Sequence, residues 1–85
     1  MNISKHEQRV LHVLAQGGAI HFERRPNGKV ATVTCVTRDG YLLAGFALPL
    51  FDRLRKRRFI KSVKGQPYRI TPAGSRAVNA QQDNR

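Results

Sequence analysis

The stretch that decides the fold is Leu48–Thr71, which reads LPLFDRLRKRRFIKSVKGQPYRIT. A helix is predicted at its start, because Pro49 fits the first helical turn, where its missing N–H leaves no hydrogen bond unmade. The apolar residues of this helix recur at helical spacing and form one stripe: Leu50, Phe51 and Leu54. Two β-branched or aromatic runs follow, Phe59–Val63 and Tyr68–Thr71, separated by the turn residues Lys64–Pro67. The stretch therefore predicts a helix followed by a β-hairpin.

The next residues extend this pattern. Thr71 and Pro72 supply the cap and first residue of a further helix, expected to run from Pro72 to about Ala80. Helix, hairpin and helix in this order form the second half of a winged helix, and the spacing resembles the recognition helix and wing of that family. Two features depart from it. Arg58 stands where a glycine commonly closes the recognition helix, and Tyr41–Phe46 is either a short second helix or a third strand, of which we favour the strand.

The segment between Arg53 and Arg69 is strongly basic and contains no acid. Its cations are Arg53, Arg55, Lys56, Arg57, Arg58, Lys61, Lys64 and Arg69. A charged helix face is often only a solvated face, but such faces usually mix both signs. Here one sign prevails and continues from the helix into the hairpin, which favours a surface for a polyanion or an acidic partner.

The helical phase suggests separate roles for these residues. Asp52, Arg53, Lys56 and Arg57 fall on or beside the solvent-facing side of the helix. We expect Arg53 and Lys56 to enter a groove of the partner. We expect Asp52 to pair with a neighbouring arginine rather than accept from a cytosine amino group. Phosphate contacts, which position a protein without reading sequence, are expected from Lys61, Lys64 and Arg69.

The N-terminal part predicts a helix and a hairpin. Ser4-Lys5-His6-Glu7 has the form of a capping box, so a helix should run from Lys5 to about Gln16. Period-two alternation then marks Ala19–Arg25 and Val30–Thr37 as strands, joined by the turn Pro26-Asn27-Gly28. The cations at this tip serve either contact with a partner or solubility: Arg24, Arg25 and Lys29.

Size and charge bound the class of protein. With 85 residues we expect a single domain over residues 1–80 and a frayed polar tail over 81–85. Sixteen Lys and Arg against five Asp and Glu give a net charge of +11, which suits a polyanionic partner or an acidic protein surface. A membrane partner is not expected, because no run approaches the roughly 20 apolar residues of a membrane span. The N-terminus carries no apolar centre of a signal peptide, so we expect a cytoplasmic location.

Candidate catalytic residues are few. Cys35 is the one cysteine, so an internal disulfide and a multi-cysteine metal site are ruled out. His6 and His12 do not share a helix face as a metal pair would. His21, with nearby arginines and Tyr68, could cut RNA by general acid–base chemistry, although nothing in the spacing requires it. Tyr68 could also stack on a base, but its alternation with Ile70 favours the core. We therefore expect no enzyme activity, no catalytic residue, no metal site and no cofactor.

Motifs spread over nearly the whole chain match one known family. They are Ser4, Glu7–Arg9, Leu11–Ala15, Gly17-Gly18, Asp39-Gly40, Leu42–Ala44, Phe51 and Leu54. The most specific motif is Gly65-Gln66-Pro67-Tyr68-Arg69-Ile70, preceded by Ile60–Val63 and followed by Gly74. In these residues the sequence resembles the YjhX-type toxin family of bacteria. The resemblance implies the toxin half of a type II toxin–antitoxin pair, linked to inhibition of DNA topoisomerase I and partnered by an antitoxin protein.

We therefore predict an α+β, winged-helix-like domain with an additional β-hairpin after the first helix, acting as a growth-arresting toxin by binding. It would dock on DNA, on an acidic face of DNA topoisomerase I, or on both together. The expected binding residues are Arg53, Lys56, Arg57, Lys61, Lys64, Arg69, Arg24 and Arg25. One alternative is a DNA-binding transcriptional regulator, which needs a homodimer with recognition helices about 34 Å apart. The other is a ribonuclease toxin.

Overall fold

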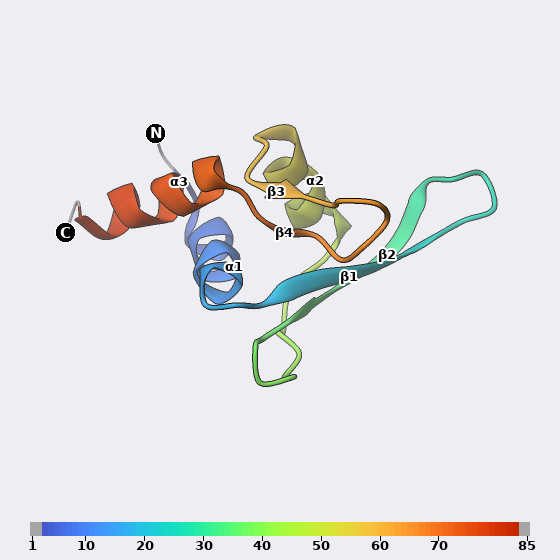
Figure 1. Cartoon of the computed structure of the whole chain (residues 1–85), viewed down its shortest axis with the longest axis horizontal. Coiled ribbons are helices and arrows are strands. Elements are labelled where there is room, and N and C mark those ends of the chain that lie inside the picture. Colours follow the sequence, from blue (N-terminus) through green and yellow to red (C-terminus); the bar gives the residue numbers. More distant parts are fainter. Residues whose placement is uncertain (1–2, 84–85) are drawn as a thin grey trace.

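In the computed structural model, which describes residues 3–83, the chain forms three helices and two small antiparallel sheets (Figure 1). The elements in order are α1 (Lys5–Ala15), β1 (Ala19–Arg24), β2 (Val30–Val36), α2 (Leu48–Lys56), β3 (Ile60–Lys61), β4 (Arg69–Ile70) and α3 (Pro72–Asp83). The predicted α+β class is confirmed. The β1–β2 ribbon reaches away from the helices, and the molecule measures 44 by 26 by 23 Å (Figure 1).

Helix α1 begins at the predicted capping box. The Glu7 N–H donates to the Ser4 hydroxyl over 3.1 Å, and the Ser4 N–H donates to the Glu7 carboxylate over 3.0 Å. Two donors at the helix start are thereby satisfied reciprocally. The helix ends one residue before the expected Gln16, where Gly17 takes a φ of +105° that favours glycine.

The β1–β2 ribbon confirms the predicted alternation. Ile20 pairs with Cys35, and both are buried, whereas His21 and Thr34 on the opposite face are exposed. The turn at the tip is closed by the Arg25 N–H, which donates to the Lys29 carbonyl over 2.8 Å. One ribbon face is thus covered by the body of the protein and the other faces solvent.

The ribbon is joined to the second sheet at one point. Ile20 and Tyr68 form an antiparallel bridge, in which each N–H donates to the other's carbonyl over 2.9 and 2.8 Å. Beyond Tyr68, β4 pairs with β3 through Ile60 and Ile70. We call residues 60–70 the wing. The expected strands Phe59–Val63 and Tyr68–Thr71 are wrong in length, because Phe59 is still bonded to the end of α2 and positive φ angles begin the turn at Lys64.

The strand expected over Tyr41–Phe46 is also wrong. Leu42 forms an isolated bridge with Val36, and the segment is otherwise irregular. Positive φ angles at Gly40 (+90°) and Gly45 (+81°) turn the chain on both sides of this bridge, which prevents an extended ladder. The structure also shows no helix between β2 and α2 within residues 3–83. The winged-helix-like architecture remains a prediction that rests on the order of α2, the wing and α3.

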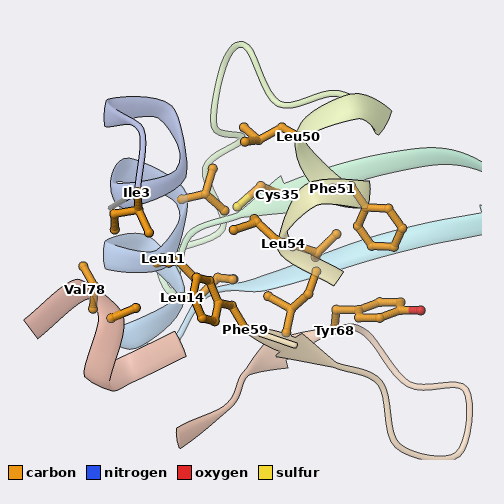
Figure 2. Packing of buried hydrophobic residues seen from close by; sticks show 14 residues of the cluster. Ile3, Leu11, Leu14, Cys35, Leu50, Phe51, Leu54, Phe59, Tyr68 and Val78 are labelled. Carbon is orange, nitrogen blue, oxygen red and sulfur yellow. The ribbon is translucent and has the colours of Figure 1, made fainter. Parts of the chain in front are cut away.

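The core lies where the three helices meet the wing (Figure 2). Its largest fully buried side chains come from all three helices, both strands of the ribbon and the residue before the wing: Leu11, Ile20, Cys35, Phe51, Leu54, Phe59 and Val78. Burial of the predicted α2 stripe is therefore confirmed. Helix α3 approaches the wing closely at Gly74, where an added Cβ would lie 2.5 Å from the Phe59 carbonyl oxygen.

Helix α3 begins as predicted and ends later. The Gly74 N–H donates to the Thr71 hydroxyl over 3.1 Å, which confirms Thr71 as the cap. The helix continues past the expected end at Ala80 to Asp83, because the sequence there contains no proline or glycine to end it. The division into a domain over 1–80 and a frayed tail over 81–85 stays a prediction. Residues 84–85 lie outside the described part of the chain.

Candidate nucleic-acid interface

Helix α2 presents two of the predicted cations to solvent. Its apolar stripe faces the core, which leaves Arg53 and Lys56 exposed on the outer side. Their expected orientation is confirmed. We call this pair the outer face of α2.

Arg57 behaves differently from the prediction. Its guanidinium donates to the Glu7 carboxylate over 2.9 Å, and the side chains are 32% and 6% exposed. Arg57 also lies over the Phe59 ring, 5.2 Å from its centroid. The cation expected on the solvent side therefore turns inward, because α1 places a buried carboxylate beside the end of α2.

The buried Glu7 is stabilised as an anion. Burial alone raises the pKa of Glu7, but hydrogen bonds from the Ser4 N–H, the Arg57 guanidinium and the Ser4 hydroxyl lower it more. The pKa of Glu7 therefore lies below its ordinary value. This ion pair ties α1 to the C-terminal end of α2.

Arg58 occupies the left-handed backbone conformation, which favours glycine. Its φ is +60°, immediately after the end of α2. The Arg58 carbonyl accepts a hydrogen bond from the Thr71 hydroxyl over 2.7 Å. Arg58 thus turns the chain from α2 into the wing, although an L-residue is strained there.

The wing cations lie away from the core. Ile60 and Tyr68 are buried in the core shared with α2, so alternation directs Lys61 and Arg69 to the opposite face of the wing. The Arg69 guanidinium reaches the Gly17 carbonyl at the end of α1 over 3.4 Å. Lys64 is exposed at the wing's turn. The cations expected in one helix-plus-wing patch are thus exposed on the outer side of α2 and on the outer face and turn of the wing, and their joint role in binding stays a prediction.

The structure instead brings α2 together with the tip of the β1–β2 ribbon. A groove of about 410 Å³ lies between them. Its lining residues are Arg24, Gly28, Lys29, Val30, Leu48, Asp52 and Arg55. Of the residues predicted to bind, Arg24 lies in this ribbon groove and Arg25 is exposed beside it on the tip.

Sequence reasoning did not assign Arg55 or Lys29 as principal site residues. Arg55 forms an ion pair with Asp52 over 3.2 Å, which confirms the arginine partner expected for Asp52. Leu48, Asp52 and Arg55 recur at helical spacing, and this was the available signal that they share one flank of α2. The other wall of the groove is formed by the ribbon, so its residues depend on how the ribbon is oriented relative to α2.

A row of aromatic rings fixes the ribbon against α2. Phe22 contacts Tyr68 edge-to-face at 5.2 Å between centroids, and Tyr68 contacts Phe51 in the same way at 4.9 Å. Arg24 caps one end over Phe22 at 5.1 Å, and Arg55 caps the other over Phe51 at 5.2 Å. Tyr68 is buried, which confirms its interpretation as a core residue. Both terminal arginines of this row line the ribbon groove.

The residues considered for catalysis are not brought together. The Tyr68 ring packs against Phe22 on one face of β1, and alternation places His21 on the other face. Burial raises the pKa of the Cys35 thiol to about 11, which disfavours its thiolate. Within residues 3–83 no three His, Cys, Asp or Glu side chains cluster closely enough to hold a metal ion. Nor does any helix in that range combine the length and apolarity needed to span a membrane.

Comparison with known proteins agrees with the sequence resemblance. A family model described as "Putative toxin of bacterial toxin-antitoxin pair" matches residues 1–85. The UPF0386 proteins of Ruegeria sp. and Parvibaculum lavamentivorans are 58% and 60% identical over 85 residues, covering the whole of both chains in each case. The UPF0386 protein of Rhodospirillum rubrum is 56% identical over 84 residues, or 99% of this chain and 93% of the relative. No solved structure matches the chain. The chain belongs to the YjhX toxin family, whose description pairs a toxin with an antitoxin.

Proposed function

We propose that this protein is a toxin that acts by binding DNA through the outer face of α2. The observation that carries the proposal is the exposure of Arg53 and Lys56 on a helix whose opposite side is fixed in the core. Cations held in this way can neutralise phosphates and release condensed counterions. The net charge of +11 supports the same partner.

Growth arrest would follow from occupation of DNA that a processing enzyme needs. The family resemblance implies DNA topoisomerase I as that enzyme, and an acidic face of the enzyme could contribute to docking. Such inhibition requires no chemistry by the toxin. The wing cations Lys61, Lys64 and Arg69 are also exposed, so they are available to DNA or to the enzyme.

The test is the affinity of the full chain for random duplex DNA, measured against salt by fluorescence anisotropy. We expect the logarithm of affinity to fall linearly with the logarithm of salt, and Arg53→Gln with Lys56→Gln to reduce the slope by about two. Arg53→Glu with Lys56→Glu should weaken binding by about a hundredfold at moderate salt. The matched control is Lys5→Glu with Arg9→Glu on the exposed face of α1, which should cause a much smaller loss.

Circular dichroism should show the same helix content in all variants, because the altered residues are exposed. DNA relaxation by topoisomerase I, assayed with the same variants, should recover from inhibition in parallel with lost DNA affinity. An affinity independent of salt would contradict the proposal. So would cleavage of RNA by the purified protein that disappears in His21→Ala.

A further inference from the structure

The ribbon groove has the composition of an anion site with an apolar floor. Arg24 and Lys29 come from the ribbon and Arg55 comes from α2, so three cations from distant parts of the sequence face one cavity. Among the described lining residues, Asp52 carries the negative charge, which leaves an excess of two positive charges. Leu48 and Val30 supply the apolar surface.

The two arginines are held in place before any ligand arrives. Arg24 donates to the Gly28 carbonyl over 2.8 Å while lying over Phe22, and Arg55 donates to Asp52 while lying over Phe51. Each guanidinium keeps further N–H donors beyond these bonds. Little side-chain entropy would therefore be lost when the two arginines bind a common oxyanion.

A second large hollow does not share these features. A hollow of about 470 Å³ beside the end of α1 is lined by Val13, Gln16, Thr37, Arg38 and Asp39. Its one cation and one acid leave no excess charge. Cavity size therefore does not distinguish the ribbon groove, which differs from this hollow in the excess positive charge of its lining. A third hollow of about 360 Å³, lined by Lys5, Gln8, Arg9, His12 and Val13, is also basic. Its cations all come from α1, whereas those of the ribbon groove come from two elements that the aromatic row holds together.

We propose that the ribbon groove binds one nucleotide of a nucleic-acid strand, with the phosphodiester against Arg24, Lys29 and Arg55 and the sugar against Leu48 and Val30. This inference rests on the proposed function and adds the ribbon as a second arm beside α2. A bare phosphate would leave most of the 410 Å³ to water, whereas a nucleotide would also cover the apolar floor. The groove would bind the sugar–phosphate backbone of the nucleic acid without contacting the base edges that carry sequence information.

Asp52 has a defined part in this site. Its carboxylate orients Arg55, but it also repels an incoming phosphate. Replacing Asp52 by Asn keeps an acceptor for Arg55 and removes the repulsion. A gain in affinity from Asp52→Asn therefore separates anion binding from a merely structural role.

The experiment is an NMR titration of the full ¹⁵N-labelled chain with 5′-phosphorylated thymidine dinucleotide at low salt. We expect saturable shifts of amide signals at Lys29, Val30, Leu48 and Asp52. Lys29→Gln with Arg55→Gln should weaken this binding by about tenfold, whereas Lys5→Gln with Arg9→Gln should leave it nearly unchanged. Asp52→Asn should strengthen it by about threefold.

Two further ligands decide the chemical class. Thymidine without phosphate should bind far more weakly, and an acidic hexaglutamate peptide should not displace the dinucleotide at equal concentration. Tighter binding of the peptide would overturn the nucleotide assignment in favour of an acidic protein segment. Shifts confined to residues outside the groove would overturn the site itself.

Variants of the outer face of α2 separate a failure of the groove inference from a failure of the proposed function. Arg53→Gln with Lys56→Gln should weaken the binding of long duplex DNA but leave the affinity for the dinucleotide unchanged. If duplex binding survives the groove variants at full strength and the dinucleotide does not bind, the groove inference fails while the proposed function stands. If the chain binds no duplex, the proposed function fails independently of the groove.

Discussion

The two flanks of α2 carry the same kind of ion pair in opposite settings. On the α1 side, Arg57 meets Glu7 at 2.9 Å and the Glu7 side chain is only 6% exposed. On the ribbon side, Arg55 meets Asp52 at 3.2 Å with side chains 48% and 49% exposed. The first pair closes a packed junction, and the second lies at the edge of an open groove. Burial, rather than the identity of the charges, decides whether an arginine of this helix stabilises the fold or remains accessible to a partner.

The largest effect on stability is expected from Arg57→Leu, which tests the contrast between the two pairs. It leaves the Glu7 carboxylate buried without its cation, so the free energy of unfolding should fall by about 3 kcal/mol. The measurement is urea denaturation followed by circular dichroism. Arg55→Leu is the matched control and should change stability by no more than about 0.5 kcal/mol. Equal losses in the two variants would show that burial does not separate the pairs.

Acidification should remove the stability that the buried Glu7–Arg57 pair contributes at neutral pH. The folded-state pKa of Glu7 lies below its ordinary value, because the Ser4 and Arg57 hydrogen bonds outweigh burial. Its contribution to stability is therefore complete above the ordinary pKa of about 4.3 and is lost as the pH falls through the lower folded pKa. Urea midpoints measured from neutrality to about pH 3 should decline, and Glu7→Gln should flatten the decline. Glu23→Gln, at an exposed carboxylate, should not flatten it.

Arg58→Gly should raise stability by about 1 kcal/mol, since glycine adopts the φ of +60° without the strain of a Cβ. Thermal unfolding would measure the gain. Arg58→Ala keeps the Cβ and should give no such gain. Equal losses of stability in both variants would contradict this prediction. They would show that the Arg58 side chain stabilises the fold by more than the strained backbone at Arg58 destabilises it.

The smallest effect is expected from the exposed pair itself. A double-mutant cycle of Arg55→Ala and Asp52→Ala should give a coupling energy below about 0.5 kcal/mol. A coupling of several times that size would place Arg55 among the structural cations. It would then weaken the comparison between the two flanks.

The sequence predicted those features that depend on neighbours along the chain. The Ser4–Glu7 capping box, the alternation of the β1–β2 ribbon and the buried stripe of α2 all follow from local spacing. The exposure of Arg53 and Lys56 follows from the same helical phase. These predictions needed no knowledge of tertiary contacts.

The errors arose where distant residues meet. Arg57 turns inward because Glu7, fifty positions away, lies beside it in space. The groove joins Arg24 to Arg55 through aromatic contacts that no local pattern reveals. The irregular path of Tyr41–Phe46 is a local exception, because the turns at Gly40 and Gly45 outweigh the β-forming composition of the segment.

The aromatic row also has a mechanical consequence. The walls of the groove belong to separate elements, and Phe22, Tyr68 and Phe51 set the angle between them. The β1–β2 ribbon extends away from the helices (Figure 1), so we expect a displacement of its tip to be transmitted to these ring contacts. A force applied at its tip would change the aperture beside α2, so any molecule that holds the tip also sets how wide that aperture stands.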